Sequence, residues 1–340
     1  MIRVVVIDDS ASTRHTLTAI LEEAPDIAVV ARAGDGDEGL RQILAHSPDA
    51  VTLDLDMPRM DGFTLLRILM ARRPTPVLVI SSHAGRDNVF RALELGAIDF
   101  IAKPASGGAA EMRAIGQELV SKIRIVARLR RFPAAPRISP HPLPKPGETL
   151  APRRLVVVGA STGGPSAVSQ IMADLDARLP LAVVIAQHMP ARFTQAFAER
   201  LDRSCGFAVR EARAGNVVRA GLALIAPGGA TTTVVRGADG VLRARVDPPD
   251  TRYRFAPSVD KLFESAAAAM GPDVIAVVLT GMAGDGAAGV QAVKARHGTI
   301  LSESPDSAVV PGMPEAAIAT GAVDEVAPLG GLATAIAKRV

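Results

Sequence analysis

Three side chains that could together transfer an acyl group follow separate apolar runs in the second half of the sequence. Ser161 follows LVVV in the segment GASTGG, His188 follows AVVIA in QHMP, and Asp285 lies in the glycine-rich segment GMAGDG after VIAVVL. A serine hydroxyl becomes a strong nucleophile when a histidine takes its proton, and the histidine needs an acid that fixes its tautomer. These residue types therefore predict a nucleophile, a base and an orienting acid.

The serine lies in a tight, glycine-rich turn. Gly159 and Gly163 complete the pattern G-x-S-x-G around Ser161, in which small neighbours let the chain turn sharply and expose the hydroxyl. The helix expected next directs backbone N–H groups toward a developing oxyanion. Such a turn can equally hold a phosphate, although the dinucleotide-binding and P-loop spacings are absent. Thr162 and Met282 flank the site, either as parts of an oxyanion or substrate pocket or as ordinary turn residues.

A second set of polar side chains follows the apolar runs of the first hundred residues. Asp8 and Asp9 follow the first run, Asp54 follows the third, Ser81 ends the fourth, and Lys103 follows the fifth. The carboxyl ends of parallel strands share one edge of a sheet, so these groups should meet there. Three carboxylates repel one another unless a hard cation neutralises them, and Mg²⁺ prefers such oxygen ligands. The set predicts a magnesium-assisted site for a phosphoryl group on a carboxylate.

The elements that position these residues alternate between short β-branched runs and amphipathic stretches. Strands are expected at residues 2–7, 27–31, 50–53, 77–80 and 99–102, and helices at 12–23, 87–95 and 111–131. Further strands are expected at 155–159, 182–186, 222–226 and 274–279, with a β-hairpin of 231–236 and 241–246 inserted in that sheet. This alternation predicts an α/β fold with two doubly wound parallel-sheet domains, one flavodoxin-like and one Rossmann-like.

The two alternating regions are separated by a proline-rich stretch at residues 132–152, PAAPRISPHPLPKPGETLAP in its main part. Prolines at this density favour an extended, semi-rigid spacer. We expect a first domain at residues 1–120, a helix end and linker at 121–151, and a second domain at 152–340.

The first domain resembles the receiver domains of two-component response regulators. The segments VVVIDDS, LDLDMPRMDGF, VISS and FIAKP carry the resemblance, in the order that this family has. The resemblance implies that Asp54 is the phosphorylated residue and that Asp8, Asp9 and Asp54 hold Mg²⁺. It also implies that Ser81 and Lys103 contact the phosphoryl group.

The second domain resembles the catalytic domain of the CheB family, the chemotaxis protein-glutamate methylesterases. GASTGG, QHMP, LTGMAGDGAAG and SESPDSAVVPGMPEAAI carry this resemblance. The chain order Ser…His…Asp differs from the order Ser…Asp…His of the α/β-hydrolases, so a general lipase or esterase is a poorer analogy. The resemblance implies that Ser161 is the nucleophile, His188 the base and Asp285 the orienting acid, with no cofactor for the esterase chemistry.

The two resemblances together imply a phosphorylation-regulated enzyme of sensory adaptation. Its expected substrates are glutamate methyl esters, and selected glutamines, on methyl-accepting chemotaxis receptors. Its expected phosphodonor is a histidine kinase of the CheA type. A CheB-like esterase of another signalling pathway, and a receiver-linked module that binds a phosphate or nucleotide without esterase activity, stay open as alternatives.

The composition excludes several other classes of protein. The chain has 38 Lys and Arg against 35 Asp and Glu, no Trp and one Tyr, so neither a basic surface nor an aromatic stacking platform for nucleic acid is expected. The single cysteine, Cys205, excludes an intramolecular disulfide and a cysteine zinc site. The apolar start is too short for a signal peptide and no apolar run approaches membrane-spanning length, so we expect a cytoplasmic protein.

Overall fold

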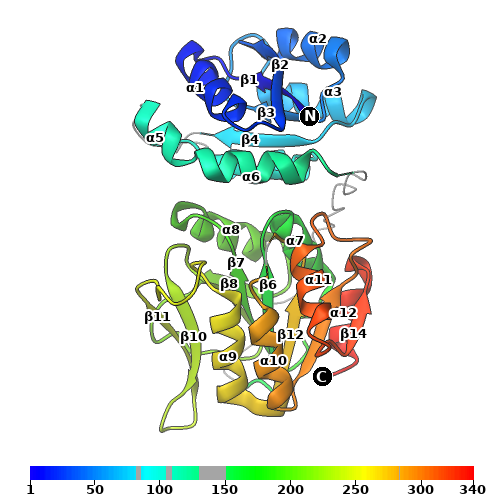
Figure 1. Ribbon diagram of the computed structural model, residues 1–340. Helices are drawn as coiled ribbons and strands as arrows, with labels where there is room; N and C mark the ends of the chain where they lie inside the picture. Colours follow the sequence, from blue (N-terminus) through cyan, green and yellow to red (C-terminus); the bar gives the residue numbers. More distant parts are fainter. Residues whose placement is uncertain (82–85, 105–108, 130–150, 283) are drawn as a thin grey trace. The chain divides into compact units, whose positions relative to one another are not determined.

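The computed structural model describes residues 1–81, 86–104, 109–129, 151–282 and 284–340. The chain divides into two units, Met1–Ala135 and Pro136–Val340, each built on its own parallel sheet (Figure 1). Residues 130–150 lie outside the described residues, and they include most of the linker predicted at 121–151 and the last two residues of the helix predicted at 111–131. Within the described segments, no helix is both long and apolar enough to cross a bilayer.

The N-terminal unit contains a five-stranded parallel sheet in the order β2-β1-β3-β4-β5, as in flavodoxin-like folds. Its strands are β1 (Ile2–Ile7), β2 (Ile27–Ala33), β3 (Ala50–Leu53), β4 (Val77–Ser81) and β5 (Asp99–Ala102). Its helices are α1 (Ala11–Glu22), α2 (Gly36–His46), α3 (Gly62–Arg72), α4 (Arg86–Glu94), α5 (Ala109–Ala114) and α6 (Gly116–Val126). Every residue of β3, β4 and β5 is buried, which explains their short and mostly apolar sequences.

The single helix predicted at residues 111–131 was wrong, because the structure has two helices, α5 and α6, that meet at Ile115. Glycine is a weak helix former, and α6 begins at Gly116. A Cβ on Gly116 would lie 3.2 Å from Ile20 Cγ2 of α1, so the glycine also permits the close approach of these helices.

The C-terminal unit contains a seven-stranded sheet in the order β14-β13-β12-β6-β7-β9-β8, and all its strand pairs are parallel. Its strands are β6 (Arg154–Ala160), β7 (Leu181–Gln187), β8 (Ala208–Glu211), β9 (Leu222–Ile225), β12 (Val274–Val278), β13 (Thr299–Glu303) and β14 (Glu325–Ala327). Its helices are α7 (Gly164–Asp174), α8 (Ala191–Ser204), α9 (Val259–Met270), the 3₁₀ helix η2 (Gly271–Asp273), α10 (Ala287–Ala295), α11 (Gly312–Ala319) and α12 (Leu329–Ala337). The parallel α/β architecture predicted for both halves is confirmed, while β8, β13 and β14 were missed.

The predicted hairpin forms between β10 (Thr231–Arg236) and β11 (Leu242–Asp247). It makes a separate two-stranded sheet and does not pair with the seven-stranded sheet. The hairpin lies beside α9 (Figure 1), where Val234 N donates to Ser265 Oγ at 3.1 Å. The hairpin itself was therefore predicted, but its predicted insertion in the large sheet was wrong.

The core of the C-terminal unit positions the carboxyl ends of three central strands. Leu155 and Val157 of β6 pack in one buried cluster with Val259 and Phe263 of α9. Strand β6 pairs with β7 on one side and with β12 on the other. The loops that follow β6, β7 and β12 therefore leave the sheet at the same edge.

Candidate active site

Ser161 lies at the turn between β6 and α7. Strand β6 ends at Ala160, and α7 begins at Gly164. Gly163, between them, has φ +78°, a left-handed conformation that favours glycine. A Cβ on Gly164 would lie 2.1 Å from Gln187 Oε1, so this position also excludes a larger residue. The two glycines allow the sharp turn that leaves Ser161 only half-buried.

Thr280, which follows β12, fixes the backbone of this turn. Its carbonyl accepts a hydrogen bond from Ser161 N at 3.0 Å, and its hydroxyl donates to Thr162 O at 2.9 Å. Thr280 N in turn donates to Glu303 Oε2 at 2.8 Å. Thr280 and Glu303 are both buried, and burial raises the pKa of the Glu303 carboxyl group. Two buried polar residues thus hold the turn that bears Ser161 in place.

His188 follows β7, and its backbone N–H donates to Ala160 O at 2.9 Å. Its Nε2 lies 2.7 Å from Asp285 Oδ2. Its Nδ1 is buried and has no hydrogen-bond partner among the described residues. The imidazole ring stacks on Phe255, with 4.3 Å between ring centroids and 15° between ring planes. When Nε2 carries the proton shared with Asp285, Nδ1 is left with the lone pair of a base.

Asp285 is buried and held by the first residues of α9. Its carboxylate accepts hydrogen bonds from Ser258 Oγ at 3.2 Å, Val259 N at 2.8 Å and Asp260 N at 3.0 Å. Burial raises its pKa, but the hydrogen bond and charge of His188 and the N–H groups of α9 outweigh that effect. Together they hold the pKa of Asp285 below its usual range. Asp285 therefore stays ionised beside the histidine.

The structure places Ser161, His188 and Asp285 at one edge of the sheet. Strands β6 and β7 pair with Ala160 opposite Gln187, so Ser161 and His188 leave adjacent strands at neighbouring positions. Adjacent strands lie about 4.8 Å apart. Among the described residues no hydrogen bond joins the Ser161 hydroxyl to His188. Such contacts are often long without substrate and shorten when it binds.

Thr162 and Met282 lie in the two loops that meet at Ser161, those after β6 and β12. Thr162 is the next residue of the turn and is 2% exposed. Met282 follows Gly281, where a Cβ would lie 2.7 Å from Ser161 Cβ. The loop that bears Met282 therefore packs against the serine. A role of either residue in an oxyanion or substrate pocket stays a prediction.

The N-terminal unit brings its own five predicted residues to one edge. Lys103 Nζ lies 2.8 Å from Asp8 Oδ2 and also pairs with Asp54 Oδ2. Ser81 ends β4 fully buried, and its hydroxyl has no hydrogen-bond partner among the described residues. Burial raises the pKa values of Asp8 and Asp54, and Lys103 opposes that rise.

The donor set at this edge fits Mg²⁺. Asp8, Asp9 and Asp54 each offer a carboxylate oxygen, and these atoms lie within 4.8 Å of one another. Oxygen atoms of carboxylates are the ligands that Mg²⁺ prefers. Two of the three carboxylates are buried, so a bound cation would relieve their desolvation.

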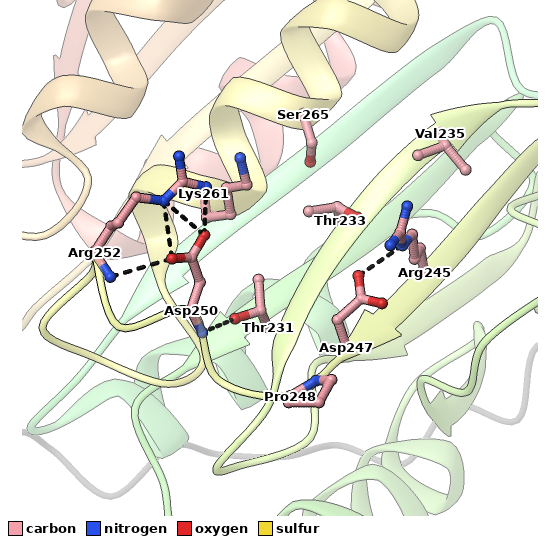
Figure 2. Close-up of a pocket in the computed structure, with 10 residues that line it drawn as sticks. All are labelled: Thr231, Thr233, Val235, Arg245, Asp247, Pro248, Asp250, Arg252, Lys261 and Ser265. Carbon is pink, nitrogen blue, oxygen red and sulfur yellow. Dashed lines mark hydrogen bonds and ion pairs between the residues drawn. The ribbon is translucent and has the colours of Figure 1, made fainter.

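A cavity of about 520 Å³ lies between the β10–β11 hairpin and α9 (Figure 2). Its acidic side chains are paired, Asp250 with Arg252 and Asp247 with Arg245. The residues that line it are Thr231, Thr233, Val235, Arg245, Asp247, Pro248, Asp250, Arg252, Lys261 and Ser265. None of the three acyl-transfer residues is among them, so this cavity is separate from the site at Ser161.

Four residues of the site were not predicted from the sequence: Thr280, Glu303, Asp260 and Phe255. Thr280 carried a usable signal, because a hydroxyl that ends a buried run, VVLT, resembles the strand-end hydroxyl already singled out at Ser81. Glu303 lies at the end of a strand that was itself missed.

Comparison with known proteins agrees with this geometry. The family model of the CheB methylesterase matches residues 156–336, and that of the response regulator receiver domain matches residues 4–114. A protein-glutamate methylesterase/protein-glutamine glutaminase of Anaeromyxobacter dehalogenans is 52% identical over 334 residues, which cover 97% of this chain and 93% of that protein. A protein of the same description from Myxococcus xanthus is 47% identical over 340 residues, covering 99% and 96%.

A solved structure matches the C-terminal unit. The crystal structure of the Thermotoga maritima CheB methylesterase catalytic domain is 35% identical, with a TM-score of 0.53, and the match covers 55% of this chain and 98% of that one. The predicted family is confirmed: the chain belongs to the CheB methylesterase family and carries a response regulator receiver domain at its N-terminal end.

Proposed function

We propose that this protein hydrolyses the methyl esters of glutamate side chains on chemotaxis receptors, and deamidates selected glutamines, with Ser161 as nucleophile. One observation carries the proposal: Ser161 and His188 leave adjacent strands, and Asp285 holds Nε2 of the histidine while Nδ1 stays available. The relatives are described as both methylesterase and glutaminase. Both reactions transfer the same glutamyl acyl group, so one nucleophile serves both.

In this mechanism Nδ1 of His188 is the base. It takes the proton from Ser161 Oγ while Oγ bonds to the ester carbonyl carbon. The tetrahedral intermediate then collapses, the proton passes from Nδ1 to the departing methoxide, and methanol leaves an acyl-serine. Water, deprotonated by the same nitrogen, hydrolyses the acyl-serine and releases the glutamate carboxylate. From a glutamine, ammonia leaves in place of methanol.

The negative charge that develops on the carbonyl oxygen needs hydrogen-bond donors that are already in place. Helix α7, which begins at Gly164, directs the positive end of its dipole toward the turn that bears Ser161. Gly164 N donates to Ser161 O and Pro165 has no N–H, so the turn residues before α7 would supply the backbone donors. We assign Thr162 and Met282 to the walls of this pocket, because Thr162 directly follows Ser161 and Met282 follows Gly281, which packs against Ser161.

Methanol release from a methylated receptor fragment tests the assignment. Ser161→Ala should lose at least about a thousandfold in kcat, because loss of the nucleophile leaves only binding and oxyanion stabilisation. Ser169→Ala is the matched control, since Ser169 lies on α7 and only donates to Pro165 O. A fluorophosphonate probe should label the wild type at Ser161. An unlabelled wild-type protein that binds a nucleotide would instead support the phosphate-binding alternative.

We propose further that the receiver domain inhibits the esterase until Asp54 is phosphorylated by a histidine kinase of the CheA type. Asp8, Asp9 and Asp54 would hold Mg²⁺, which neutralises charge at the phosphorylated carboxylate. Ser81 and Lys103 bind the phosphoryl oxygens. Such a kinase uses ATP, which places the reaction in the cytoplasm.

A small-molecule phosphodonor should raise kcat of the wild type and of Asp56→Asn, and should leave Asp54→Asn unchanged. Asp56 is the matched control, because it lies two residues beyond Asp54 and is exposed. Removal of residues 1–150 should raise the basal rate. A relative's catalytic domain has been solved by itself, which supports this truncation. A folded truncation with an unchanged or lower rate would contradict inhibition by the receiver domain.

A further inference from the structure

The helices α9 and α10 each cap the N-terminus of the other. Helix α10 begins after Gly286, which has φ +106° and no side chain that could cap it. The missing cap comes from α9, where Asp260 Oδ1 accepts hydrogen bonds from Gly286 N at 2.8 Å and Gly289 N at 2.7 Å. Backbone N–H groups at a helix start need such acceptors.

The capping is reciprocal, because Asp285 precedes α10 and accepts from the N–H groups of α9. Val259 N and Asp260 N both donate to the Asp285 carboxylate, at 2.8 and 3.0 Å. Asp260 therefore binds Asp285 through its backbone and binds the next residue, Gly286, through its side chain. Asp260 thus restrains the backbone on the C-terminal side of Asp285.

Close packing makes this arrangement stiff. A Cβ on Gly289 would lie 2.7 Å from Phe263 Cβ and 3.1 Å from Asp260 Cα, so α9 and α10 touch at a glycine. A Cβ on Gly159 would lie 2.2 Å from Val259 Cγ1, so the start of α9 also presses on β6 just before the nucleophile turn. The N-terminus of α9 thus contacts the elements that carry both the acid and the serine.

The charge of Asp260 is unfavourable at this place. Burial, together with the neighbouring charge of Asp285, raises the pKa of Asp260 to about 6. A second carboxylate beside an orienting acid therefore costs stability near neutral pH, since two like charges repel. The two short hydrogen bonds to α10 are the contribution that offsets this cost.

We propose that Asp260 is a positioning residue of the esterase, which holds Asp285 in register with His188 by capping α10 from α9. The inference rests on the proposed function of the triad. The positioning depends on the acceptor oxygen of Asp260 more than on its charge. Asparagine keeps this oxygen for the two glycine N–H groups and loses the charge, whereas alanine loses both.

Kinetics of methanol release in the full-length protein separate these roles. Asp260→Ala should lower kcat by about 10- to 100-fold, as a displacement of roughly 1 Å in a catalytic group does, with KM changed less than twofold. Asp260→Asn should retain at least a third of the wild-type kcat. The rate at which a fluorophosphonate labels Ser161 should follow kcat in both variants, because labelling needs the same base.

Asp324→Ala is the matched control for stability. Asp324 also accepts from a backbone N–H, that of Ile300 at 2.8 Å, and also pairs with α10, through Lys294. It should lower the urea midpoint without lowering kcat. If Asp260→Ala shows the same pattern as Asp324→Ala, the residue is only structural and the proposal is overturned. Equal losses of kcat in Asp260→Asn and Asp260→Ala also overturn it.

The proposed function is judged by the wild type in the same assay. A wild-type protein that releases no methanol contradicts the esterase assignment itself. If the wild type releases methanol and the Asp260→Ala variant has the same kcat, only the positioning role of Asp260 is contradicted.

Discussion

The hydroxyl of Thr280 offers a sharp test of how the nucleophile turn is held. It donates to Thr162 O at 2.9 Å and accepts from Val310 N at 2.8 Å, and the side chain is fully buried. Thr280→Val keeps the shape of the side chain and removes both hydrogen bonds. Thr280→Ser keeps both bonds and removes only a methyl group.

The expected magnitudes follow from these contacts. Each buried backbone group that loses its partner costs about 1–3 kcal/mol, so two such groups cost about 2–6 kcal/mol. Valine has no hydroxyl whose burial would cost desolvation energy, and this offsets part of the loss. We therefore expect Thr280→Val to lower the free energy of unfolding by about 2–4 kcal/mol. Thr280→Ser loses the burial of one methyl group, about 1 kcal/mol.

Urea unfolding followed by tyrosine fluorescence measures this difference. The chain has no tryptophan and one tyrosine, Tyr253, so the signal comes from the C-terminal unit alone. In the folded protein the Tyr253 hydroxyl donates to Glu264 Oε2 at 2.6 Å, a contact that unfolding removes. Thr280→Val should also lower kcat for methanol release about tenfold, since Thr162 directly follows the nucleophile. Equal unfolding free energies for the valine and serine variants would refute the reasoning.

Three further perturbations probe the same site. Glu303→Gln should gain stability relative to the wild type as the pH rises above 4.5. The buried Glu303 carboxyl has a raised pKa, so through this group the folded wild type binds more protons than the unfolded chain and loses stability as the pH rises, whereas the variant lacks this contribution; urea midpoints of the two proteins at pH 5 and pH 8 measure the difference. Phe255→Ala should lower kcat between about twofold and tenfold, the worth of one aromatic stack, and an unchanged kcat would mean that the ring does not orient the catalytic histidine. Gly164→Ala should cost about 1–3 kcal/mol because its Cβ would meet Gln187 Oε1, whereas Gly330→Ala on α12, with 3.6 Å to the nearest atom, should be tolerated in the same thermal melt.

The strands that carry the predicted chemistry could be found from the sequence because they are buried on both faces. Strands β1, β3 and β5 have the predicted bounds, Ile2–Ile7, Ala50–Leu53 and Asp99–Ala102. Most of their residues are apolar, and each strand is followed directly by a polar residue, Asp8, Asp54 or Lys103. The same contrast marks the ends of β6 and β7, and it is why Ser161 and His188 could be found from the sequence.

The missed strands lack this contrast. Strand β14 has three residues, and β8, AVRE, has two apolar residues followed by two charged ones at the edge of the sheet. Strand β13, TILSE, ends in Ser302 and Glu303, which are buried although both are polar. A sequence pattern assigns such residues to a loop, because only the fold reveals that Thr280 N satisfies the glutamate.

Residues that hold the site could not be found from spacing, because their partners are distant in sequence and are backbone atoms. Thr280 bonds to Thr162 across 118 positions, and Asp260 bonds to Gly286 across 26. A backbone N–H or carbonyl is present at every residue, so no residue type marks it as a partner. The sequence shows Asp260 only as an acid in the first turn of a helix. Such an acid normally stabilises its own helix and no other.

The reciprocal caps explain how an acid in a glycine-rich loop is held in place. A loop rich in glycine is flexible by itself, and a flexible acid would not fix the tautomer of His188. The first residues of α9 hold the Asp285 carboxylate by hydrogen bonds. Helix α9 in turn packs against Gly159, next to the turn that bears Ser161. The helix that holds Asp285 is thus also in contact with the strand that precedes Ser161.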